Sequence, residues 1–477
     1  MSADPADARL AQSARPSGWV NPEPRGRYDL VVVGGGTAGL VSAIGAAGLG
    51  ARVALVERGL LGGDCLNTGC VPSKALLRSA RAAAEARRAP ELGVGVGGVE
   101  ADFAAVMRRM RERRADISPH DSAARLTAAG VDVHFGEARF TGPSAVAVGG
   151  RTLTFRRAVI ATGGRAAVPQ IPGLAAMPYL TSETLFALTE QPRRLTIVGA
   201  GPIGCEMAQA FARLGTAVTL VDQEPQVLPR EDADAAAIVA RRLAADGVTL
   251  RLGLTPASRS SFDGQILVAA GRVPNIEGLD LPAAGVAFTA AGVVVDDHLR
   301  TSNRRIYAAG DVCSAFKFTH AADAHARIVI RNALFFGRAR ASALVIPWCT
   351  YTDPEVAHVG AYEEDARRAG RRVETMTIPL ADVDRAVVDE ERDGFVRIHH
   401  ERGRLLGCTV VASRAGELIA LAAHALTHGA SLAALGSTIQ PYPTLANAFR
   451  AAGDAYGRTR LTPAVRALLQ RYFGVFR

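Results

Sequence analysis

The sequence predicts an α/β protein with two domains built around parallel sheets, followed by a smaller C-terminal α+β domain. Three observations predict this fold class. A strand, a glycine-rich turn and a helix follow one another from residue 28 and again from residue 195, and alternating strands begin near residue 345. At 477 residues, with 48% hydrophobic and 21% charged residues, the chain is long enough for about three globular domains.

The first unit carries a dinucleotide-binding pattern. A strand at residues 28–33 leads into a GxGxxG turn, a helix, and a second strand at residues 52–56 that ends at Glu57. The three glycines of the pattern are Gly34, Gly36 and Gly39. Glycines at these places let the backbone approach a pyrophosphate, and Glu57 can accept from a ribose hydroxyl. We therefore expect a Rossmann-like domain here.

The pattern occurs a second time. A strand at residues 195–198 leads into a similar turn, and a strand at residues 217–221 ends at Asp222. The glycines of this turn are Gly199, Gly201 and Gly204. Two dinucleotide sites in one chain imply FAD and a nicotinamide. Asp222 would accept from a free 2′-hydroxyl and repel a 2′-phosphate, and the next residue is Gln223, so NADH is expected over NADPH. Arg230 is the residue that could reverse this preference.

Two cysteines, Cys65 and Cys70, lie five positions apart downstream of the first turn. On an ideal helix this spacing gives a rise of roughly 7.5 Å, which is beyond the usual Cα separation of a disulfide. The pair can close only if the first helical turn is irregular. Glycines that allow this are Gly62, Gly63 and Gly69. Cys70 would then lie near a helix N-terminus, where the dipole favours a thiolate, so a redox-active disulfide is favoured over a structural one.

The stretch GGDCLNTGCVPSK at residues 62–74 resembles the redox motif of the class I pyridine nucleotide-disulfide oxidoreductases. Its residues are similar to those of the mercuric reductase-like and dihydrolipoamide dehydrogenase-like flavoproteins. The resemblance implies that Cys65 is the interchange thiol that meets substrate, and that Cys70 contacts the flavin and forms a charge-transfer complex with it. It also implies an ion pair between Lys74 and Glu206 beside the flavin. The alternative for Glu206 is a first-turn acid that complements its helix dipole.

Further segments extend the resemblance over nearly the whole chain. They are residues 161–163, 269–272 and 308–311, which contain Thr162, Gly163, Gly271, Gly310 and Asp311. By resemblance, Asp311 hydrogen-bonds the ribityl chain of FAD. The residues from about 345 onward, with a helical stretch at 416–429, resemble the family's dimerisation domain. Because active sites in that family are completed by the partner subunit, a homodimer is implied.

These assignments give the expected domain limits. We expect a disordered segment at 1–26, the first part of the FAD-binding domain with the redox disulfide at 27–174, the NAD(P)-binding domain at 175–290, the second part of the FAD-binding domain at 291–340, the dimerisation domain at 341–460 and a tail at 461–477.

The chain departs from the family pattern in three places. Relatives carry a histidine followed five residues later by a glutamate near the C-terminus, and this chain has Tyr442 and Asn447 there. Neither side chain is an acid or base poised near pH 7. The tail lacks the vicinal cysteines of mercuric reductases, which disfavours a true mercuric reductase. An antiparallel meander that the family places in the NAD domain is expected to be shortened to a linker at 253–265.

Composition excludes several other classes. The net charge of +9 comes from dispersed arginines without interleaved aromatic residues, so no nucleic-acid partner is expected. Residues 30–51 lack charge, but their seven glycines indicate a buried strand, turn and helix, so no membrane partner is expected either. The N-terminus does not resemble a signal peptide, which makes the cytoplasm the default location. His424 and His428 are four apart but lack a third ligand, so no metal site is predicted.

The resulting interpretation is a homodimeric FAD-dependent oxidoreductase that passes electrons from NADH through FAD to Cys65 and Cys70. The small-molecule acceptor would be a disulfide, a soft metal ion or a quinone-like oxidant. Tyr442 from the partner chain would line the acceptor pocket. Two alternatives stay open: a diaphorase that reduces quinones directly from the flavin, and a degenerate FAD-binding homologue without catalytic activity.

Overall fold

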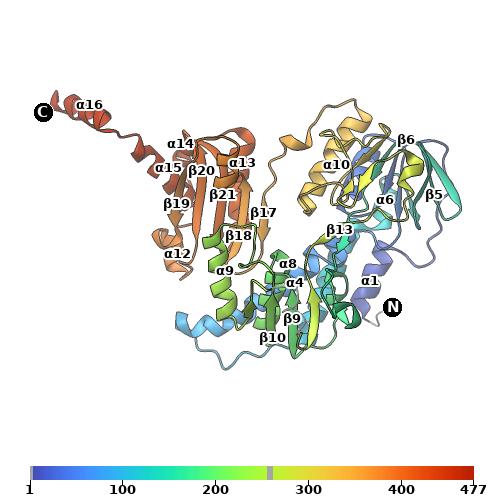
Figure 1. Ribbon diagram of the computed structural model, residues 1–477, viewed down its shortest axis with the longest axis horizontal. Helices are drawn as coiled ribbons and strands as arrows, with labels where there is room; N and C mark the ends of the chain where they lie inside the picture. Colours follow the sequence, from blue (N-terminus) through green and yellow to red (C-terminus); the bar gives the residue numbers. More distant parts are fainter. Residues whose placement is uncertain (1–3, 255–261, 477) are drawn as a thin grey trace. The chain divides into compact units, whose positions relative to one another are not determined.

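The computed structural model describes residues 4–254 and 262–476 (Figure 1). These residues form two compact units. Unit 1 consists of Met1–Val227 and Leu243–Leu344, and unit 2 consists of Leu228–Arg242 and Val345–Arg477. The mixed α/β class with two parallel-sheet domains and a C-terminal α+β domain agrees with the sequence prediction.

The first sheet of unit 1 has seven strands, in the order β3-β2-β1-β6-β5-β4 with β16 paired to β6. Its strands are β1 (Tyr28–Val33), β2 (Val53–Glu57), β3 (Val131–Phe135), β4 (Arg139–Gly142), β5 (Ala145–Val148), β6 (Arg151–Ile160) and β16 (Ile306–Ala308). The central strands are parallel, and β1 is almost wholly buried because its run of apolar residues is covered on both faces. The packed helices include α2 (Thr37–Gly48) and α10 (Thr319–Leu334).

Strand register brings the first set of sequence motifs together. In this sheet Val33 is level with Ile160, and Ile160 is level with Ala308. The turns that follow these three strands therefore emerge side by side at the carboxyl edge of the sheet. Ligands of doubly wound sheets bind at this edge.

The second sheet of unit 1 repeats the arrangement with five parallel strands in the order β11-β10-β9-β12-β8. They are β8 (Tyr179–Leu180), β9 (Arg194–Val198), β10 (Ala217–Val221), β11 (Thr249–Arg251) and β12 (Gln265–Val268). Val198 is level with both Val221 and Val268, so the turns after these strands also meet. Helix α8 (Pro202–Arg213) follows β9, as the sequence predicts.

Part of the predicted linker at 253–265 lies outside the described residues. Between β11 and β12, the residues that the structure does describe form no further strand. The connection between Arg251 and Gln265 is short for the antiparallel meander that the family has in this place. The shortened meander remains a prediction for residues 255–261.

The prediction of disorder over residues 1–26 is wrong for much of that segment. Pro5–Ala14 forms helix α1, which Asp4 caps by accepting from the backbone N–H of Ala6 at 2.9 Å. Leu10 is buried with Leu66 and Ala115 in a small apolar cluster. The polar composition hid this packing, because only one face of the helix is apolar.

Unit 2 is built on a five-stranded antiparallel sheet in the order β17-β18-β21-β20-β19 (Figure 1). Its strands are β17 (Trp348–Thr350), β18 (Glu355–Gly360), β19 (Glu374–Pro379), β20 (Phe395–Glu401) and β21 (Arg404–Ala412). Helix α13 (Ala415–His428) packs on β18 and β21 and matches the helix predicted at 416–429. Helices α14 (Leu432–Ser437), α15 (Asn447–Thr459) and α16 (Pro463–Gly474) follow.

A short segment from the middle of the chain belongs to unit 2. Glu231 is buried and accepts hydrogen bonds from the Trp348 indole at 2.9 Å and the Tyr362 hydroxyl at 2.6 Å. Burial raises the pKa of this carboxyl. Asp232 pairs with Arg397 at 2.9 Å. These polar contacts fix the start of helix α9 (Ala233–Ala245) to the antiparallel sheet.

Two glycines let α14 and α15 cross closely, and the loop between these helices carries Tyr442. A Cβ on Gly453 would come within 2.4 Å of the Gly436 nitrogen and 2.5 Å of the Leu432 carbonyl oxygen. Both contacts are with backbone, which cannot move aside without separating the helices.

Replacing Gly453 with alanine is expected to lower the free energy of unfolding of unit 2 by about 1 to 3 kcal/mol, because overpacking forces the backbone apart. Urea unfolding followed by circular dichroism measures the change. Gly457→Ala in the same helix is the matched control, because nothing lies within 4 Å of its Cβ. Equal midpoints for the two variants would contradict the close crossing.

Candidate active site

The turn after β1 has the geometry of a pyrophosphate cradle. Gly34 has φ of 108°, and a Cβ at this position would come within 2.3 Å of the Ala161 carbonyl oxygen. A Cβ on Gly39 would come within 1.8 Å of the Gly34 carbonyl oxygen. No described side chain caps the N-terminus of α2, so its first N–H groups are available to an anion. The residues of this turn fit a dinucleotide.

Glu57 lies at the end of β2, beside the same turn. Its carboxylate accepts from the backbone N–H of Gly35 at 2.5 Å and from that of Gly59 at 2.6 Å. Burial raises the pKa of this group, while the two backbone donors oppose that change. The sequence predicts Glu57 at the end of this strand, and the structure agrees. Its hydrogen bond to Gly35 places the carboxylate beside the turn, where a ribose hydroxyl could donate to it.

The turn after β9 repeats the geometry. Gly199 has φ of 110°, and a Cβ there would come within 2.5 Å of the Ala269 carbonyl oxygen. A Cβ on Gly204 would come within 1.8 Å of the Gly199 carbonyl oxygen. Asp222 accepts from the backbone N–H of Ala200 at 2.5 Å. The two turns are thus near copies of each other, and both fit dinucleotides.

Segments after β6 and β16 complete the carboxyl edge of the first sheet. Thr162 donates from its hydroxyl to the Asn275 carbonyl at 2.7 Å, and Asn275 returns a bond to the Thr162 carbonyl at 2.9 Å. Gly163 and Gly310 turn the chain here with positive φ, and Gly271 does so after β12. The two segments of the predicted FAD-binding domain meet because β16 pairs with β6, although they are far apart in the sequence.

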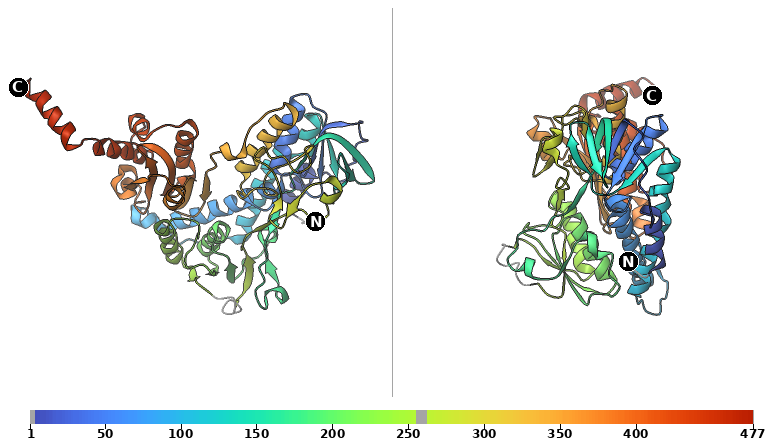
Figure 2. Two further views of the ribbon diagram at one scale, coloured as in Figure 1. Left: turned by 45° about the horizontal axis from the view of Figure 1, so that its top comes forward. Right: turned by 90° about the vertical axis from the view of Figure 1, so that its right-hand side faces the viewer.

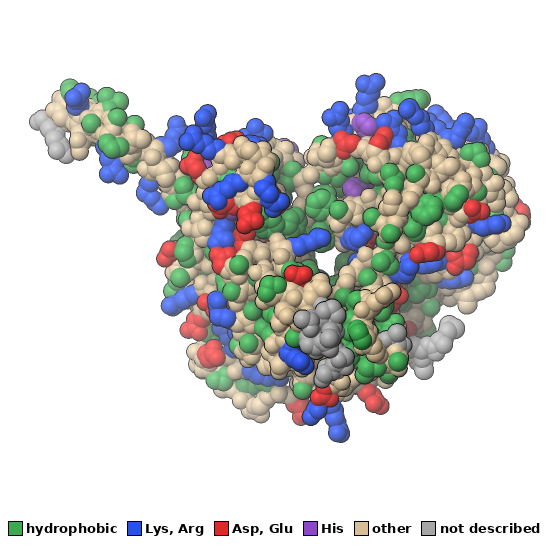
Figure 3. All heavy atoms as spheres, viewed as in Figure 1, with side chains coloured by type: hydrophobic (Ala, Val, Ile, Leu, Met, Phe, Trp, Pro, Cys, Tyr) green, Lys and Arg blue, Asp and Glu red, His purple; other side chains and the backbone are tan. Residues whose placement is uncertain are grey.

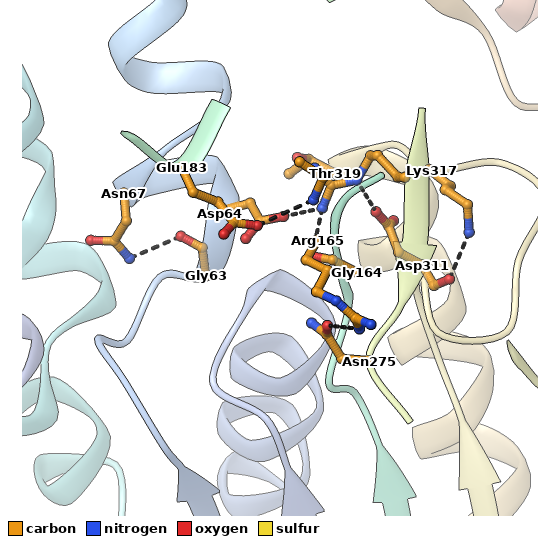
Figure 4. A network of polar contacts seen from close by, with 12 residues as sticks. Gly63, Asp64, Asn67, Gly164, Arg165, Glu183, Asn275, Asp311, Lys317 and Thr319 are labelled. Atoms are coloured by element: carbon orange, nitrogen blue, oxygen red, sulfur yellow. Dashed lines mark hydrogen bonds and ion pairs between the residues drawn. The ribbon is translucent and has the colours of Figure 1, made fainter. Parts of the chain in front are cut away.

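A network of charges surrounds Asp311 (Figure 4). Arg272 donates to the Asp311 carboxylate at 3.2 Å and pairs closely with Asp64. Burial raises the pKa of Asp311, and the charges of Arg272 and Lys317 oppose that change. Lys317 also donates to the Asp311 carbonyl at 2.9 Å. Asp64 immediately precedes Cys65, so the network links the cysteine motif to the nucleotide-binding edge.

The cysteine motif spans two helices with a break between them. Helix α3 (Gly63–Asn67) contains Cys65, and Cys70 is the first residue of α4 (Cys70–Arg88). Gly69 separates the helices with φ of −134° and ψ of −110°. The predicted irregular turn and the position of Cys70 at a helix N-terminus are confirmed. Both cysteines are free thiols in the structure, so the disulfide between them stays a prediction.

The pKa values of the two cysteines are shifted in opposite directions. The hydrogen bond from Cys65, the Thr319 hydroxyl and the charge of Lys74 lower the pKa of Cys70 to about 6, although burial acts in the other direction. The Thr319 oxygen lies 3.3 Å from the Cys70 sulfur. For Cys65, the same sulfur–sulfur hydrogen bond and burial raise the pKa above its ordinary value. Near neutral pH the pair therefore holds one thiolate, on Cys70, and one thiol, on Cys65.

The predicted ion pair between Lys74 and Glu206 forms at 2.8 Å. Lys74 lies one turn after Cys70 in α4, and Glu206 lies in the first half of α8, where it is buried. The ammonium is less buried than its partner. The pair brings a positive charge close to the Cys70 thiolate and ties the two helices together.

Tyr442 lies in unit 2 and is strongly exposed. Its hydroxyl donates to the Asp384 carboxylate at 2.8 Å, which raises the pKa of the tyrosine. Asn447 accepts from the backbone N–H of Thr444 at 3.1 Å and so has a local structural contact. Among residues 4–254 and 262–476, no cluster of three histidine, cysteine, aspartate or glutamate side chains could hold a metal ion.

Sequence reasoning missed two residues of this site, Thr319 and the bridging role of Arg272. Both act over long sequence separations, since Thr319 is 249 positions from Cys70 and Arg272 is 208 positions from Asp64. The signal that could have found Thr319 is its position shortly after the segment 308–311, where it is the first residue of helix α10.

Comparison with known proteins now identifies the family. Residues 28–326 match the family described as "Pyridine nucleotide-disulphide oxidoreductase", and residues 346–452 match its dimerisation domain. The chain belongs to this family. It is a FAD-dependent pyridine nucleotide-disulfide oxidoreductase that uses NAD(P)H. The matched dimerisation domain supports a homodimer.

Several relatives of this oxidoreductase span most of its length. A mercuric reductase from Lysinibacillus sphaericus is 35% identical over 90% of this chain and 83% of the relative. A dihydrolipoyl dehydrogenase from Haloferax volcanii is 34% identical over 90% of this chain and 96% of the relative. Among solved structures, the HOCl-induced flavoprotein disulfide reductase RclA from Escherichia coli, as its Cu(II) complex, has a TM-score of 0.79 and 28% identity, covering 90% of this chain and 99% of that one.

Replacing Thr319 with valine is expected to raise the pKa of Cys70 by roughly one pH unit, because a hydrogen bond to a charged acceptor is lost. The rate of iodoacetamide alkylation of the prereduced protein, measured from pH 5 to pH 8, reports the change. Wild type should reach half its maximal rate near pH 6. Cys313 should not interfere, since burial raises its pKa to about 12.

Thr319→Ser is the matched control, since it keeps the hydroxyl and should retain the wild-type pH profile. An unchanged profile for the valine variant would show that the threonine does not stabilise the thiolate.

Proposed function

We propose that this oxidoreductase takes electrons from NADH and delivers them through FAD and the Cys65–Cys70 pair to a small oxidant. The observation that carries the proposal is the placement of the two cysteines. Cys70 starts α4 with its sulfur 3.3 Å from the Thr319 hydroxyl, and its pKa is lowered, while Cys65 lies in the separate helix α3 and its pKa is raised. A pair of this kind holds one nucleophile and one proton at neutral pH, which suits a two-electron thiol relay.

The residues that would hold FAD lie at the carboxyl edge of the first sheet. Gly34, Gly36 and Gly39 would cradle its pyrophosphate and Glu57 a ribose hydroxyl, while Thr162, Gly163, Gly310 and Asp311 would contact the rest of the cofactor. When bound, FAD supplies the acceptor for a hydride from the nicotinamide. On the second sheet Gly199, Gly201, Gly204 and Gly271 would shape the nicotinamide site.

The side chains around the sulfurs then take separate roles. Cys65 would contact the oxidant, and its proton can pass to Cys70 through the hydrogen bond between the sulfurs. Lys74 would stabilise negative charge on Cys70, and Glu206 would hold the ammonium in place at 2.8 Å. Tyr442 of the partner subunit would line the oxidant pocket, where it is a weak acid.

Among oxidants, a soft metal ion is better supported than a disulfide. Disulfide exchange needs an acid to protonate the leaving thiolate, an effect worth about two to four decades in rate, and Tyr442 and Asn447 do not supply one. Two adjacent thiols are suitable ligands for soft metals. The relatives named above include a mercuric reductase, and RclA has been solved with Cu(II). A quinone-like oxidant remains the second candidate because the flavin itself can reduce it.

Replacing Cys65 with serine is expected to abolish NADH-dependent reduction of Hg(II) or Cu(II), by at least about a hundredfold, because the relay loses the sulfur that contacts the oxidant. Steady-state NADH oxidation with each oxidant measures this, and Cys349→Ser in unit 2 serves as the control cysteine. Metal reduction that survives in Cys65→Ser would contradict the relay. Quinone reduction that survives alone would identify the direct flavin route, and failure of NADH to reduce bound FAD would indicate a degenerate homologue.

The preference for NADH is proposed on the charge of Asp222, which ends β10 beside the second turn. A carboxylate there accepts from a 2′-hydroxyl and repels a 2′-phosphate.

Replacing Asp222 with asparagine is expected to reduce the NADH-to-NADPH ratio of kcat/KM by about tenfold, which corresponds to about 1.4 kcal/mol. Glu224→Gln removes the same charge two residues further on and should leave the ratio unchanged. A wild-type enzyme that uses NADPH better than NADH would refute the assignment.

A further inference from the structure

Helix α16 (Pro463–Gly474) makes no buried contact with the rest of unit 2. Thr462 caps it, accepting from the backbone N–H of Val465 at 3.4 Å, so the helix has a defined start. It projects from its unit (Figure 2). Green apolar side chains are visible on its surface (Figure 3). Exposed fractions of its large apolar side chains run from 38% for Val465 to 67% for Leu468. Apolar side chains exposed together in this way are typical of an interaction surface.

The apolar side chains form one continuous stripe. The α16 apolar face consists of Val465, Leu468, Leu469, Tyr472 and Phe473. Their spacing of three and four residues places them on one side of the helix. At about 100° per residue, Arg466 and Arg471 fall on either side of this stripe. Two of the five members are aromatic, a type of residue that favours the boundary between lipid and water.

Charge indicates what the occupant is. From residue 455 to residue 477 the sequence has five arginines and no aspartate or glutamate. The arginines are Arg458, Arg460, Arg466, Arg471 and Arg477. An apolar stripe bordered by arginines complements a surface that is apolar below and negatively charged above. An anionic lipid bilayer has this structure.

We propose that α16 is an interfacial anchor that inserts its apolar face among the headgroups of an anionic bilayer, with its arginines on lipid phosphates. At 12 residues the helix is about 18 Å long, well short of the roughly 30 Å of a bilayer core, so it lies in the surface. Of the described helices, none is long and apolar enough to span a membrane. The sequence prediction of no membrane partner concerned a membrane-spanning segment at residues 30–51, and binding of a helix to the bilayer surface is a different interaction.

The anchor is independent of the oxidant, so it can be tested on FAD-loaded full-length protein without an activity assay. Flotation with vesicles of phosphatidylglycerol and phosphatidylcholine, compared with phosphatidylcholine alone, measures binding. We expect binding to the anionic vesicles only, with a loss at 1 M NaCl. Replacing Arg466 or Arg471 with glutamine should weaken binding roughly fivefold each. Leu468→Ser with Phe473→Ser should abolish it.

Val388→Ser is the matched control, because Val388 is an exposed apolar residue elsewhere in unit 2. It should bind like wild type, and unchanged circular dichroism spectra in all variants would show that they are folded. The competing occupant is a second copy of the chain, since α16 follows the dimerisation domain. Absence of vesicle binding by wild type, or equal binding to neutral vesicles, would overturn the proposal. So would sedimentation equilibrium in which Leu468→Ser with Phe473→Ser converts dimer to monomer while vesicle binding persists.

Discussion

The register of parallel strands is the constraint on which both nucleotide sites depend. In each sheet of unit 1 three strands end level with one another, so turns that are distant in the sequence meet at one edge. At this edge the turn after one strand passes so close to a carbonyl group after the neighbouring strand that a Cβ would collide with it. Only glycine fits at such a position. Gly34 against Ala161 and Gly199 against Ala269 are two such positions. The two turns therefore have the same backbone geometry, which is suited to a diphosphate in each case.

The cysteine site combines this edge with a local break in helical structure. Cys70 starts a helix, and the dipole of that helix, a hydroxyl and an ammonium all act on its sulfur in the same direction. Cys65 lies in a separate short helix, where its hydrogen bond with Cys70 and burial raise its pKa, so it keeps its proton. The break at Gly69 makes Cys70 the first residue of its own helix.

The parts of the fold and site that follow local rules could be predicted from the sequence. Both glycine turns, the helix start at Cys70 and the pairing of Lys74 with Glu206 depend on spacing or on a family resemblance. The contacts of Thr319 and Arg272 could not be predicted, because each joins elements more than 200 positions apart. Residues 1–26 were misjudged for a different reason: their few apolar side chains are aligned on one helix face, which composition does not reveal.

The polar contacts of Glu231 and Asp232 also determine how the protein can be divided. Because residues 228–242 belong with residues 345–477, the chain passes between its two units three times. A fragment that begins at residue 345 would leave the indole of Trp348 and the hydroxyl of Tyr362 without the carboxylate that they bind. A fragment that contains all of unit 2 therefore needs residues 228–242 joined to residues 345–477, because neither unit is one uninterrupted stretch of the sequence.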